Sequence, residues 1–385
     1  MTLTELQTNE ELRRHEFPIV AKQIFLGHGA VCPLPRRVKD AVQRMAERSM
    51  DADQDAALPQ NFIADTRSLI ARSLGARPEE IAFVGPTSLG ISLIAGSIKW
   101  RRGQNVVIYH DDYPSNVYPW MALADRGVQV RFLNVRELGK IRMIDVQGQV
   151  DENTRLVALS SAHFVSGWRL PIETLGNWLR GRGIWFCLDA IQTLGAFPTS
   201  AASTDFLAAD LHKWMLGPCA AGVLYVRQER HEALTPTVQG WNNLRSPMFL
   251  TEEHLEYRKD ARRFEAGSHN LLGLAGLRES FLLLEEIGIA AIAADLLHKR
   301  QWLVKALRER GCEVLNADAP ADNTSGITSF ALPGQDMVAL HRRLLEANVV
   351  ANIRKTRDGR FWLRFTPHYY NTMEELHRSV ELLTP

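Results

Sequence analysis

The sequence predicts an α/β protein with a large domain built on a doubly wound, mostly parallel sheet and a smaller α+β C-terminal domain. Three observations predict this fold. Between residues 80 and 226, short apolar runs alternate with longer helical patterns. The runs are apolar on both faces, as expected of strands buried between two layers of helices. After residue 236 the pattern changes to mixed helices and strands, which is typical of an α+β domain.

Seven apolar runs are the predicted strands of the large sheet. They span residues 81–84, 106–109, 128–133, 156–160, 184–188, 206–209 and 222–226. Helical patterns lie between several of them, for example at 89–99 and 172–180. Strand and helix in alternation predict a doubly wound sheet.

The second part of the chain begins with a charged stretch at 252–263, followed by a long apolar helix from about Asn270. Further strands are predicted at 312–315, 327–331, 349–353 and 361–365, with a helix at 337–347. In the last strand Trp362, Arg364 and Thr366 share one face. We place the large domain at residues 20–255. The small domain then comprises residues 1–19 and 256–385, with the connecting helix.

The composition is that of an ordinary folded protein, with 385 residues, 45% of them hydrophobic and 23% charged. Because 45 basic residues balance 44 acidic ones and no basic block occurs, a nucleic-acid partner is not expected. No apolar run reaches the roughly 18 residues of a membrane span, and the N-terminus lacks a signal-peptide pattern. Four widely spaced cysteines argue against a zinc ribbon or a disulfide framework. We expect an enzyme in the reduced cytoplasm.

Ligands of such sheets bind outside the carboxyl ends of the strands. There, Thr87 and Ser88 follow the first strand and open a helix. Their hydroxyls and the free amides of a helix N-terminus can hold a phosphate, although either residue could simply cap the helix. Gly85 and Gly90 have the spacing of a P-loop, but Ile91 replaces the lysine, which disfavours nucleoside triphosphates.

Two other strand ends carry charged residues. Asp189 ends an apolar strand, where a carboxylate needs a cation such as a protonated ring nitrogen, unless it caps the next helix. Lys213 follows another strand in the segment 210–214. Burial there would lower the pKa of its amine, which could then form a Schiff base. The alternative is a surface lysine in a loop.

Tyr113 follows the strand at 106–109 and could stack on a flat ligand. His110, Asp111 and Asp112 precede it. No metal site is predicted from them, because adjacent residues at a strand end point in different directions and no second histidine motif appears. A phosphate cradle, a carboxylate for a ring nitrogen, an aromatic ring and a lysine for an aldehyde together predict pyridoxal 5′-phosphate as cofactor.

With these motifs, the sequence resembles the class-V aminotransferase family of fold-type I pyridoxal-phosphate enzymes, which includes cysteine desulfurases, kynureninase and isopenicillin N epimerase. The resemblance runs over nearly the whole chain, and its most specific parts are the segments 189–192, 212–214 and 364–372. The stretch 263–270 resembles the family segment that reaches the phosphate of the partner subunit, through Gly267 and Ser268. The resemblance therefore implies a homodimer with shared active sites.

The resemblance also implies roles for single residues. Lys213 would form the internal aldimine and move the α-proton of the substrate. Asp189 would pair with the pyridinium nitrogen, Gln192 would approach the phenolic oxygen, and Tyr113 would lie over the ring. Arg364 would clamp the α-carboxylate of the substrate. The phosphate would be held by Thr87, Ser88 and His212.

Two departures from the family pattern affect the expected reaction. The loop at 352–360 lacks the nucleophilic cysteine of cysteine desulfurases, and Cys312 lies too early in the chain to replace it. Persulfide-forming desulfuration is therefore disfavoured. At 162–168, Phe164 and Trp168 make the sequence more similar to the epimerase and kynureninase side of the family. His163 in this stretch either faces the substrate as a catalytic residue or caps the strand.

We expect an enzyme that removes the α-proton of an amino acid, with transamination, β-elimination or epimerisation as the outcome. The alternatives are a C–S lyase similar to cysteine desulfurases or selenocysteine lyases, and a non-catalytic scaffold that binds the cofactor. Several residues are candidates for contacts with the substrate side chain, although loop packing or surface charge explains each equally well. They are His28, Trp241, Asn242, Arg354 and Trp362.

Overall fold

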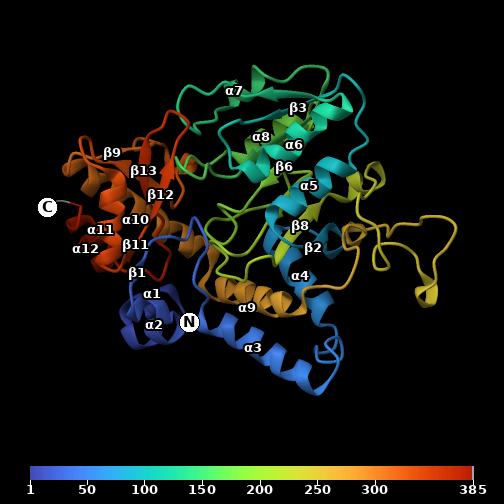
Figure 1. Ribbon diagram of the computed structural model, residues 1–385, viewed down its shortest axis with the longest axis horizontal. Coiled ribbons are helices and arrows are strands. Elements are labelled where there is room, and N and C mark those ends of the chain that lie inside the picture. Colours follow the sequence, from blue (N-terminus) through green and yellow to red (C-terminus); the bar gives the residue numbers. More distant parts are fainter. Residues whose placement is uncertain (384–385) are drawn as a thin grey trace.

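A seven-stranded sheet forms the centre of the structure, a computed structural model that describes residues 1–383 (Figure 1). The strand order is β2-β8-β7-β6-β5-β3-β4. Strands β3 to β7 pair in parallel, whereas β8 is antiparallel to both of its neighbours. The predicted, mostly parallel sheet is therefore confirmed. Its strands are β2 (Ile81–Val84), β3 (Asn105–Ile108), β4 (Gln129–Phe132), β5 (Thr154–Ser160), β6 (Trp185–Asp189), β7 (Phe206–Ala209) and β8 (Gly222–Val226).

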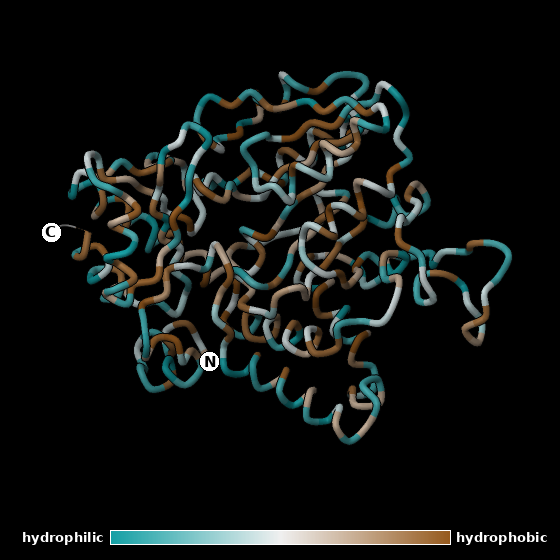
Figure 2. Tube along the Cα trace, in the orientation of Figure 1, coloured by the Kyte–Doolittle hydropathy of each residue, from teal (hydrophilic) through white to brown (hydrophobic). Residues whose placement is uncertain are grey.

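Both faces of this sheet are covered by helices. On one face α9 (Leu271–Ile287) packs against α3 (Arg36–Asp51) and α4 (Phe62–Leu74), and on the other α5 (Thr87–Ser97) packs against β7 and β8. In the strands other than β4, alternate residues enter the two separate cores, as the period of a strand requires. Figure 2 shows the hydrophobic residues running along the central strands.

One strand departs from the expectation that all seven runs are buried on both faces. Gln129 and Phe132, at the two ends of β4, are exposed. The physical reason is that β4 lies at the edge of the sheet, next to β3 alone. The prediction of a doubly buried strand at 128–133 is wrong in this respect.

The small domain contains a four-stranded antiparallel sheet in the order β12-β13-β10-β9. Its strands are β9 (Glu313–Val314), β10 (Thr328–Ala331), β12 (Asn352–Lys355) and β13 (Phe361–Phe365). Leu363 and Phe365 of β13 pack in a core with α10 (Ile289–Glu309), α11 (Met337–Glu346) and α12 (Met373–Glu381). The other face of β13 turns towards the large domain. The remaining helices are α1 (Leu3–Thr8), α2 (Glu10–Glu16), α6 (Tyr118–Met121), α7 (Met143–Gln147) and α8 (Ile172–Arg180).

The strand predicted at 349–353 is two strands. β11 (Val349–Val350) pairs in parallel with β1 (Ile24–Phe25), whereas β12 pairs with β13. The chain breaks between them at Ala351 because the two halves have different partners. Residues 24–25, which we placed in the large domain, therefore form backbone contacts with the C-terminal part of the chain. The division at residue 255 stays a prediction.

A long loop projects from the body on the side opposite the small domain (Figure 1, yellow). Its base at Asn242 is held by backbone and side-chain hydrogen bonds to Ala266 and Gly267. Met248, Phe249 and Leu250 on this loop are exposed, Met248 by 87%. We call residues 241–256 the arm. Its apolar side chains have little of the described chain to cover them.

Within residues 1–383, no helix combines the length and apolar character that crossing a membrane requires.

Candidate active site

Lys213 lies at the carboxyl edge of the large sheet, in the segment that follows β7. Its side chain is only 7% exposed, so the alternative of a surface lysine is wrong. The Nζ atom lies 5.1 Å from the centre of the Tyr113 ring. Burial lowers the pKa of Lys213 to about 8, with Asp189 opposing and Arg364 adding to the shift. A buried amine with this pKa is partly unprotonated near neutral pH and can act as a nucleophile or a base.

Asp189 ends β6 and faces the same edge. It is 2% exposed, and its Oδ1 accepts a hydrogen bond of 3.0 Å from the Ile191 amide, which belongs to a turn and not to a helix. No hydrogen bond from residues 1–383 reaches Oδ2. Burial and the nearby Asp112 carboxylate raise the pKa of Asp189 to about 7. Lys213 is close enough to oppose this shift, but no cation of residues 1–383 forms an ion pair with Asp189. A protonated ring nitrogen of a ligand would supply one.

Asp189→Asn should make the cofactor-free protein more stable at high pH. The pKa of Asp189 in the folded state lies above its ordinary 3.8, so ionisation destabilises the fold as the pH rises from about 4 to about 7. One pKa unit corresponds to about 1.4 kcal/mol, so we expect a gain of a few kcal/mol at most at pH 8 and none near pH 4. Thermal unfolding of both proteins across this range measures it. Parallel stability curves would contradict the assignment.

The N-terminus of α5 provides free hydrogen-bond donors next to Lys213. Pro86 is the N-cap and makes no side-chain cap bond, so the alternative that Thr87 or Ser88 caps the helix is wrong. The first intrahelical bond is donated by the Leu89 amide to Pro86 O, which leaves the amides of Thr87 and Ser88 without a partner in the described chain. Such amides at a helix N-terminus bind anions.

Asp210 ties this helix end to the Lys213 segment. Its backbone amide donates to Thr87 Oγ1 at 2.8 Å, and its carboxylate accepts from the amides of Leu211, Ala220 and Ala221. His212 Nδ1 lies 2.8 Å from Asp210 Oδ2, so His212 Nε2 remains available for an anion. Burial opposes ionisation of Asp210, but the bond with His212 and the amide bonds hold its pKa below the usual value. Sequence reasoning missed this positioning role.

Asp112, also missed as a positioning residue, fixes the loop that carries Tyr113. It accepts hydrogen bonds from the amide and hydroxyl of Ser160, at 3.1 and 2.8 Å, and from Asn116 Nδ2. Tyr113 is 43% exposed and touches Phe164 edge-on, with 5.4 Å between ring centres. In the sequence, Ser160 at the end of the neighbouring strand β5 could have indicated this role of Asp112. No group of three metal-ligating side chains occurs among the residues described.

Arg364 on β13 points from the small domain towards the large one. Its guanidinium is fully buried and donates to Phe164 O and to Asn352 Oδ1, while Nε has no partner. Burial, and secondarily the Arg354 guanidinium, hold the pKa of Arg364 well below its usual value. Asn352, which sequence reasoning missed, lies opposite Arg364 in the β12–β13 register. A buried guanidinium with unused donors is suited to a carboxylate.

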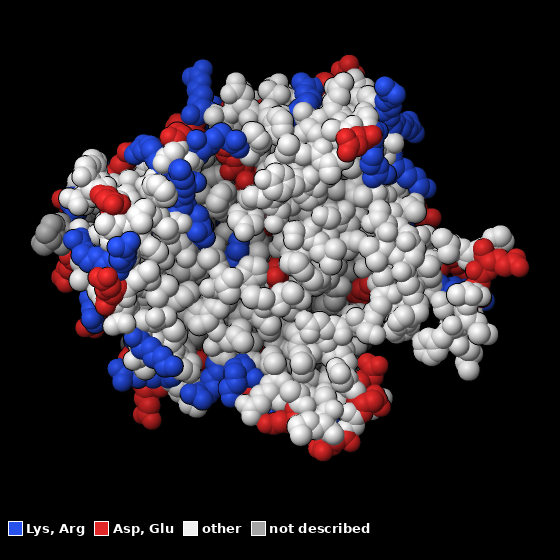
Figure 3. Space-filling view, in the orientation of Figure 1, with Lys and Arg blue, Asp and Glu red and all other residues white. Residues whose placement is uncertain are grey.

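The two domains meet beside these residues. Arg357 Nε of the small domain lies 2.5 Å from Asp111 Oδ1 of the large domain. A pocket of about 400 Å³ opens here, and its lining includes Asp112, Phe164 and Arg357. Figure 3 shows the surface hollowed at the junction of the domains, with Lys and Arg side chains near the hollow.

A comparison with protein families decides which family this arrangement belongs to. The family model described as aminotransferase class-V matches residues 24–377. The chain belongs to the aminotransferase class-V family. This confirms the predicted family and fold-type I architecture, and the protein is an enzyme that depends on pyridoxal 5′-phosphate.

Similar proteins and structures are described as desulfurases and a C–S lyase. A probable cysteine desulfurase of Methanothermobacter thermautotrophicus is 26% identical, over 97% of both chains. A cysteine desulfurase of an Enterobacter species is 28% identical over 73% of each. The apo cysteine desulfurase of Thermococcus onnurineus has the same fold, with a TM-score of 0.88 at 23% identity over 97% of both chains. So does the cystine C–S lyase C-DES in complex with cysteine persulfide, with a TM-score of 0.86 at 21% identity, covering 96% of this chain and 99% of that one.

The donors of this class-V site fit the cofactor. Two unpartnered amides and His212 Nε2 suit a phosphate, the unpaired Asp189 oxygen suits a protonated ring nitrogen, and the Lys213 amine makes no hydrogen bond within residues 1–383. Gln192 is placed differently from its expected role at the phenolic oxygen. Its amide oxygen accepts from Trp214 Nε1 and its nitrogen donates to Gly29 O, so both ends of the amide are engaged.

Both histidines that we expected near the substrate are buried and fully hydrogen-bonded. His28 Nδ1 lies 2.8 Å from Thr366 O, and Nε2 lies 2.7 Å from Tyr370 Oη. His163 Nδ1 accepts from the Ser166 amide, and Nε2 lies 2.9 Å from Asp111 O. Burial lowers the pKa of both rings. Neither histidine has a ring nitrogen left for catalysis or substrate binding, so we do not carry these expectations further.

The structure does not bring every predicted residue to Lys213. Trp241 is half exposed at the base of the arm, against Phe249. Trp362 is buried, and its Nε1 donates to Thr356 Oγ1. Gly267 and Ser268 line a cavity of about 310 Å³ together with Gly85 and Leu89 of the same chain.

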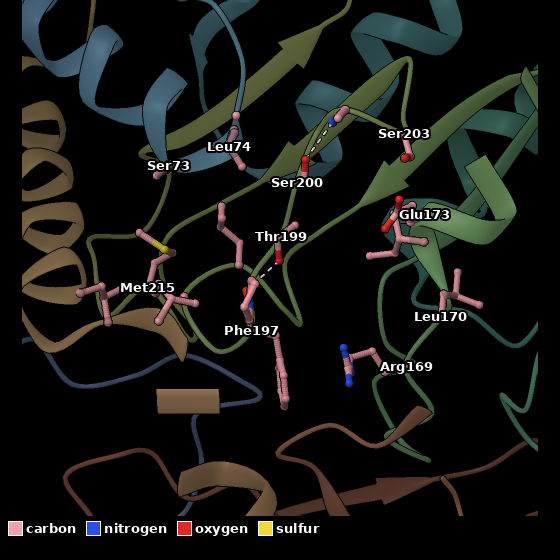
Figure 4. A pocket seen from close by; sticks show the side chains of 18 of the residues that line it. Ser73, Leu74, Arg169, Leu170, Glu173, Phe197, Thr199, Ser200, Ser203 and Met215 are labelled. Carbon is pink, nitrogen blue, oxygen red and sulfur yellow. Dashed lines mark hydrogen bonds between the residues drawn. The ribbon is translucent and has the colours of Figure 1, made fainter. Parts of the chain in front are cut away.

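A larger cavity, of about 880 Å³, lies away from these residues (Figure 4). Its lining includes Arg169, Phe197 and Met215 but none of the predicted site residues. The Arg169 guanidinium donates to the carbonyls of Thr324 and Ala321 and stacks on Phe197. The Arg169 cation is thus engaged in structural contacts, and the cavity lies outside the Lys213 site.

Proposed function

We propose that this class-V enzyme is a β-eliminating lyase that acts on an amino acid. The observation that carries the proposal is the convergence of Lys213, Asp189 and Arg364 at the domain junction, with no cysteine on the hairpin between β12 and β13. When bound, pyridoxal phosphate supplies an electron sink that stabilises negative charge on the α-carbon of the substrate.

Different residues of the chain would bind the cofactor, bind the substrate and accept the α-proton. The amides of Thr87 and Ser88, with His212, would hold the phosphate. Asp189 would keep the ring nitrogen protonated, and Lys213 would hold the aldehyde group. Arg364 would fix the α-carboxylate, and Asn352 keeps its guanidinium in position. The lowered pKa of Lys213, about 8, makes its amine a suitable acceptor for the α-proton.

The raised pKa of the cysteine thiols supports release of the β-substituent directly, without transfer to a cysteine of the enzyme. Cys32, Cys187 and Cys312 are buried, and burial raises the pKa of all three thiols. Cys219 is exposed, but burial of its sulfur and the nearby Asp210 also raise its pKa. A thiolate that accepts sulfur needs a lowered pKa. In the elimination, the α-proton goes to Lys213 and the substituent leaves with the bonding electron pair. Hydrolysis of the remaining fragment gives a keto acid and ammonia.

Product analysis of the holoenzyme with a panel of β-substituted amino acids tests this reaction. We expect a keto acid, ammonia and the released substituent in equal amounts. Persulfide bound to the enzyme would indicate a desulfurase instead. A keto acid that retains its β-substituent would indicate a transaminase, and the opposite enantiomer would indicate an epimerase. Each of these three outcomes contradicts the proposal.

We also propose that the enzyme is a homodimer. The exposed Met248, Phe249 and Leu250 of the arm form an apolar surface that a second copy would cover. The arm is attached to the Gly267 segment through Asn242, so its docking would also position that segment. Sedimentation analysis measures the mass in solution, and a monomer at micromolar concentration would contradict the proposal.

A further inference from the structure

Arg354 lies on the same face of the small sheet as Arg364. In the antiparallel register of β12 and β13, Asn352 pairs with Arg364 and Arg354 pairs with Trp362. Paired residues and residues two apart on a strand share a face. Arg354 is therefore the diagonal neighbour of Arg364 on the face that turns towards Lys213. Its guanidinium is close enough to lower the pKa of both Lys213 and Arg364.

No carboxylate of residues 1–383 forms an ion pair with Arg354. Within residues 1–383, its side chain makes one hydrogen bond, from Nη1 to Ile353 O. Burial lowers the pKa of Arg354, and among the described residues the Tyr113 phenol opposes the shift. The neighbouring arginines of the same hairpin differ, because Arg357 pairs with Asp111 and Arg360 pairs with Glu313. A half-buried guanidinium without an anion is costly to keep.

The charges of the proposed complex leave Arg354 without a partner. The α-carboxylate of the substrate would neutralise Arg364. A protonated ring nitrogen would pair with Asp189, and the phosphate would lie at the α5 N-terminus with His212. Lys213 carries no negative charge, whether its amine holds the aldehyde group or accepts the α-proton, so it cannot neutralise Arg354. A substrate with an uncharged side chain offers Arg354 nothing, whereas a second anionic group on the substrate would fill this position.

We propose that Arg354 binds an anionic group on the substrate side chain, so that the enzyme prefers acidic amino acids. A carboxylate, a sulfinate or a phosphate has the required charge and accepts hydrogen bonds from a guanidinium. The inference rests on the proposed function, since it places the amino acid between Lys213 and Arg364. In the β-elimination, the departing substituent would be a phosphate, or would carry the anionic group beyond the atom that leaves with the bonding electron pair. L-Aspartate therefore tests binding alone, because its β-carboxylate cannot leave with that pair.

Binding measurements with matched pairs of amino acids test the preference. L-Aspartate is compared with L-asparagine, and O-phospho-L-serine with L-serine, by calorimetry and by the change in the visible absorption of the holoenzyme. We expect the acidic member of each pair to bind roughly tenfold to a hundredfold tighter, as is usual for a charge-assisted hydrogen-bond pair. Arg354→Gln should remove this difference. Because Arg354 also lies near Lys213 and Arg364, the readout is the ratio of affinities within each pair and not the affinity for L-asparagine or L-serine alone.

Arg360→Gln is the matched control. It makes the same change of charge on the same hairpin, but the Arg360 guanidinium is neutralised by Glu313 at 2.5 Å. We expect this variant to keep the preference. Arg354→Lys should recover part of the preference, because the charge is restored without the planar fork.

The outcomes separate this inference from the proposed function. If the wild-type holoenzyme binds amino acids without preferring the acidic ones, the inference is overturned and the function stands. If Arg354→Gln keeps the preference, another residue is responsible and the assignment to Arg354 is overturned. If no amino acid binds or alters the absorption, the proposed function fails and this inference fails with it.

Discussion

The Lys213→Ala variant will lose covalent attachment of the cofactor and at least about a thousandfold of turnover, because one amine performs both tasks in the proposed site. Lys213 is the residue with a buried amine at the carboxyl edge of the sheet, with its pKa lowered to about 8. Borohydride reduction followed by mass spectrometry measures the attachment, and keto acid formation measures turnover. A variant that still carries reduced cofactor on the protein would disprove the assignment.

The Lys213→Arg variant tests whether the positive charge of the side chain is sufficient or whether an amine that can lose its proton is required. Arginine keeps a positive charge, but its pKa above 12 prevents loss of a proton at ordinary pH. We therefore expect the arginine variant to be as inactive as the alanine variant. Neither substitution removes a hydrogen bond found within residues 1–383, so we expect both variants to fold. Thermal unfolding of both cofactor-free variants checks this.

The Arg364→Met variant will bind amino acids more weakly by about 2–5 kcal/mol, which is the usual effect of removing one partner of a buried charge pair. This corresponds to a dissociation constant at least roughly thirtyfold higher. Methionine has a similar length and no charge, so it fills the space between Phe164 and Asn352. Titration of the holoenzyme with the best amino acid of the panel gives the affinity.

Stability measurements distinguish weaker amino-acid binding by Arg364→Met from misfolding of the variant. Arg364 is fully buried, and its Nε has no hydrogen-bond partner. Arg364→Met removes this buried cation but also its hydrogen bonds to Phe164 O and Asn352 Oδ1. Because the two effects oppose each other, we expect only a small change in the unfolding temperature. Unchanged amino-acid affinity in a stable variant would remove Arg364 from the substrate site.

The fold was predicted well where the ends of a short run are marked in the sequence, as Asp205 and Asp210 mark the ends of the run at 206–209. The predicted bounds 206–209, 222–226 and 361–365 are those of β7, β8 and β13. The run at 128–133 carries Gln129 and Arg131 at alternate positions, a pattern typical of a strand with one face towards solvent that the prediction overlooked. Which strands lie beside it depends on residues distant in sequence. The break at Ala351 was missed for the same reason, since the partners of β11 and β12 lie at opposite ends of the chain.

The candidate site was predicted in part. Its position at the strand ends, and the burial of Lys213 and Asp189, follow from apolar strands that end in charged residues. The hydrogen bonds of His28 and His163 could not be foreseen, because a histidine's ring nitrogens are engaged by carbonyls and hydroxyls that only the folded chain brings near. Asn352 was missed because its role depends on which residue of β13 lies opposite.

The pairing of β1 with β11 has a consequence for how this enzyme is made. Ile24 is synthesised long before its partner Val349, which follows it 349 − 24 = 325 residues later in the chain. The amide of Leu26 must also wait for Val350 O, and the Leu26 carbonyl for the Thr366 amide. Closing so long a loop is slow, and until then the early strand has an unpaired edge open to aggregation. Arg364, which lies between these late partners in sequence, takes its place only at the same final step. A nascent chain is therefore inactive until the segment that holds Val349 and Arg364 has been synthesised and has folded back onto Ile24.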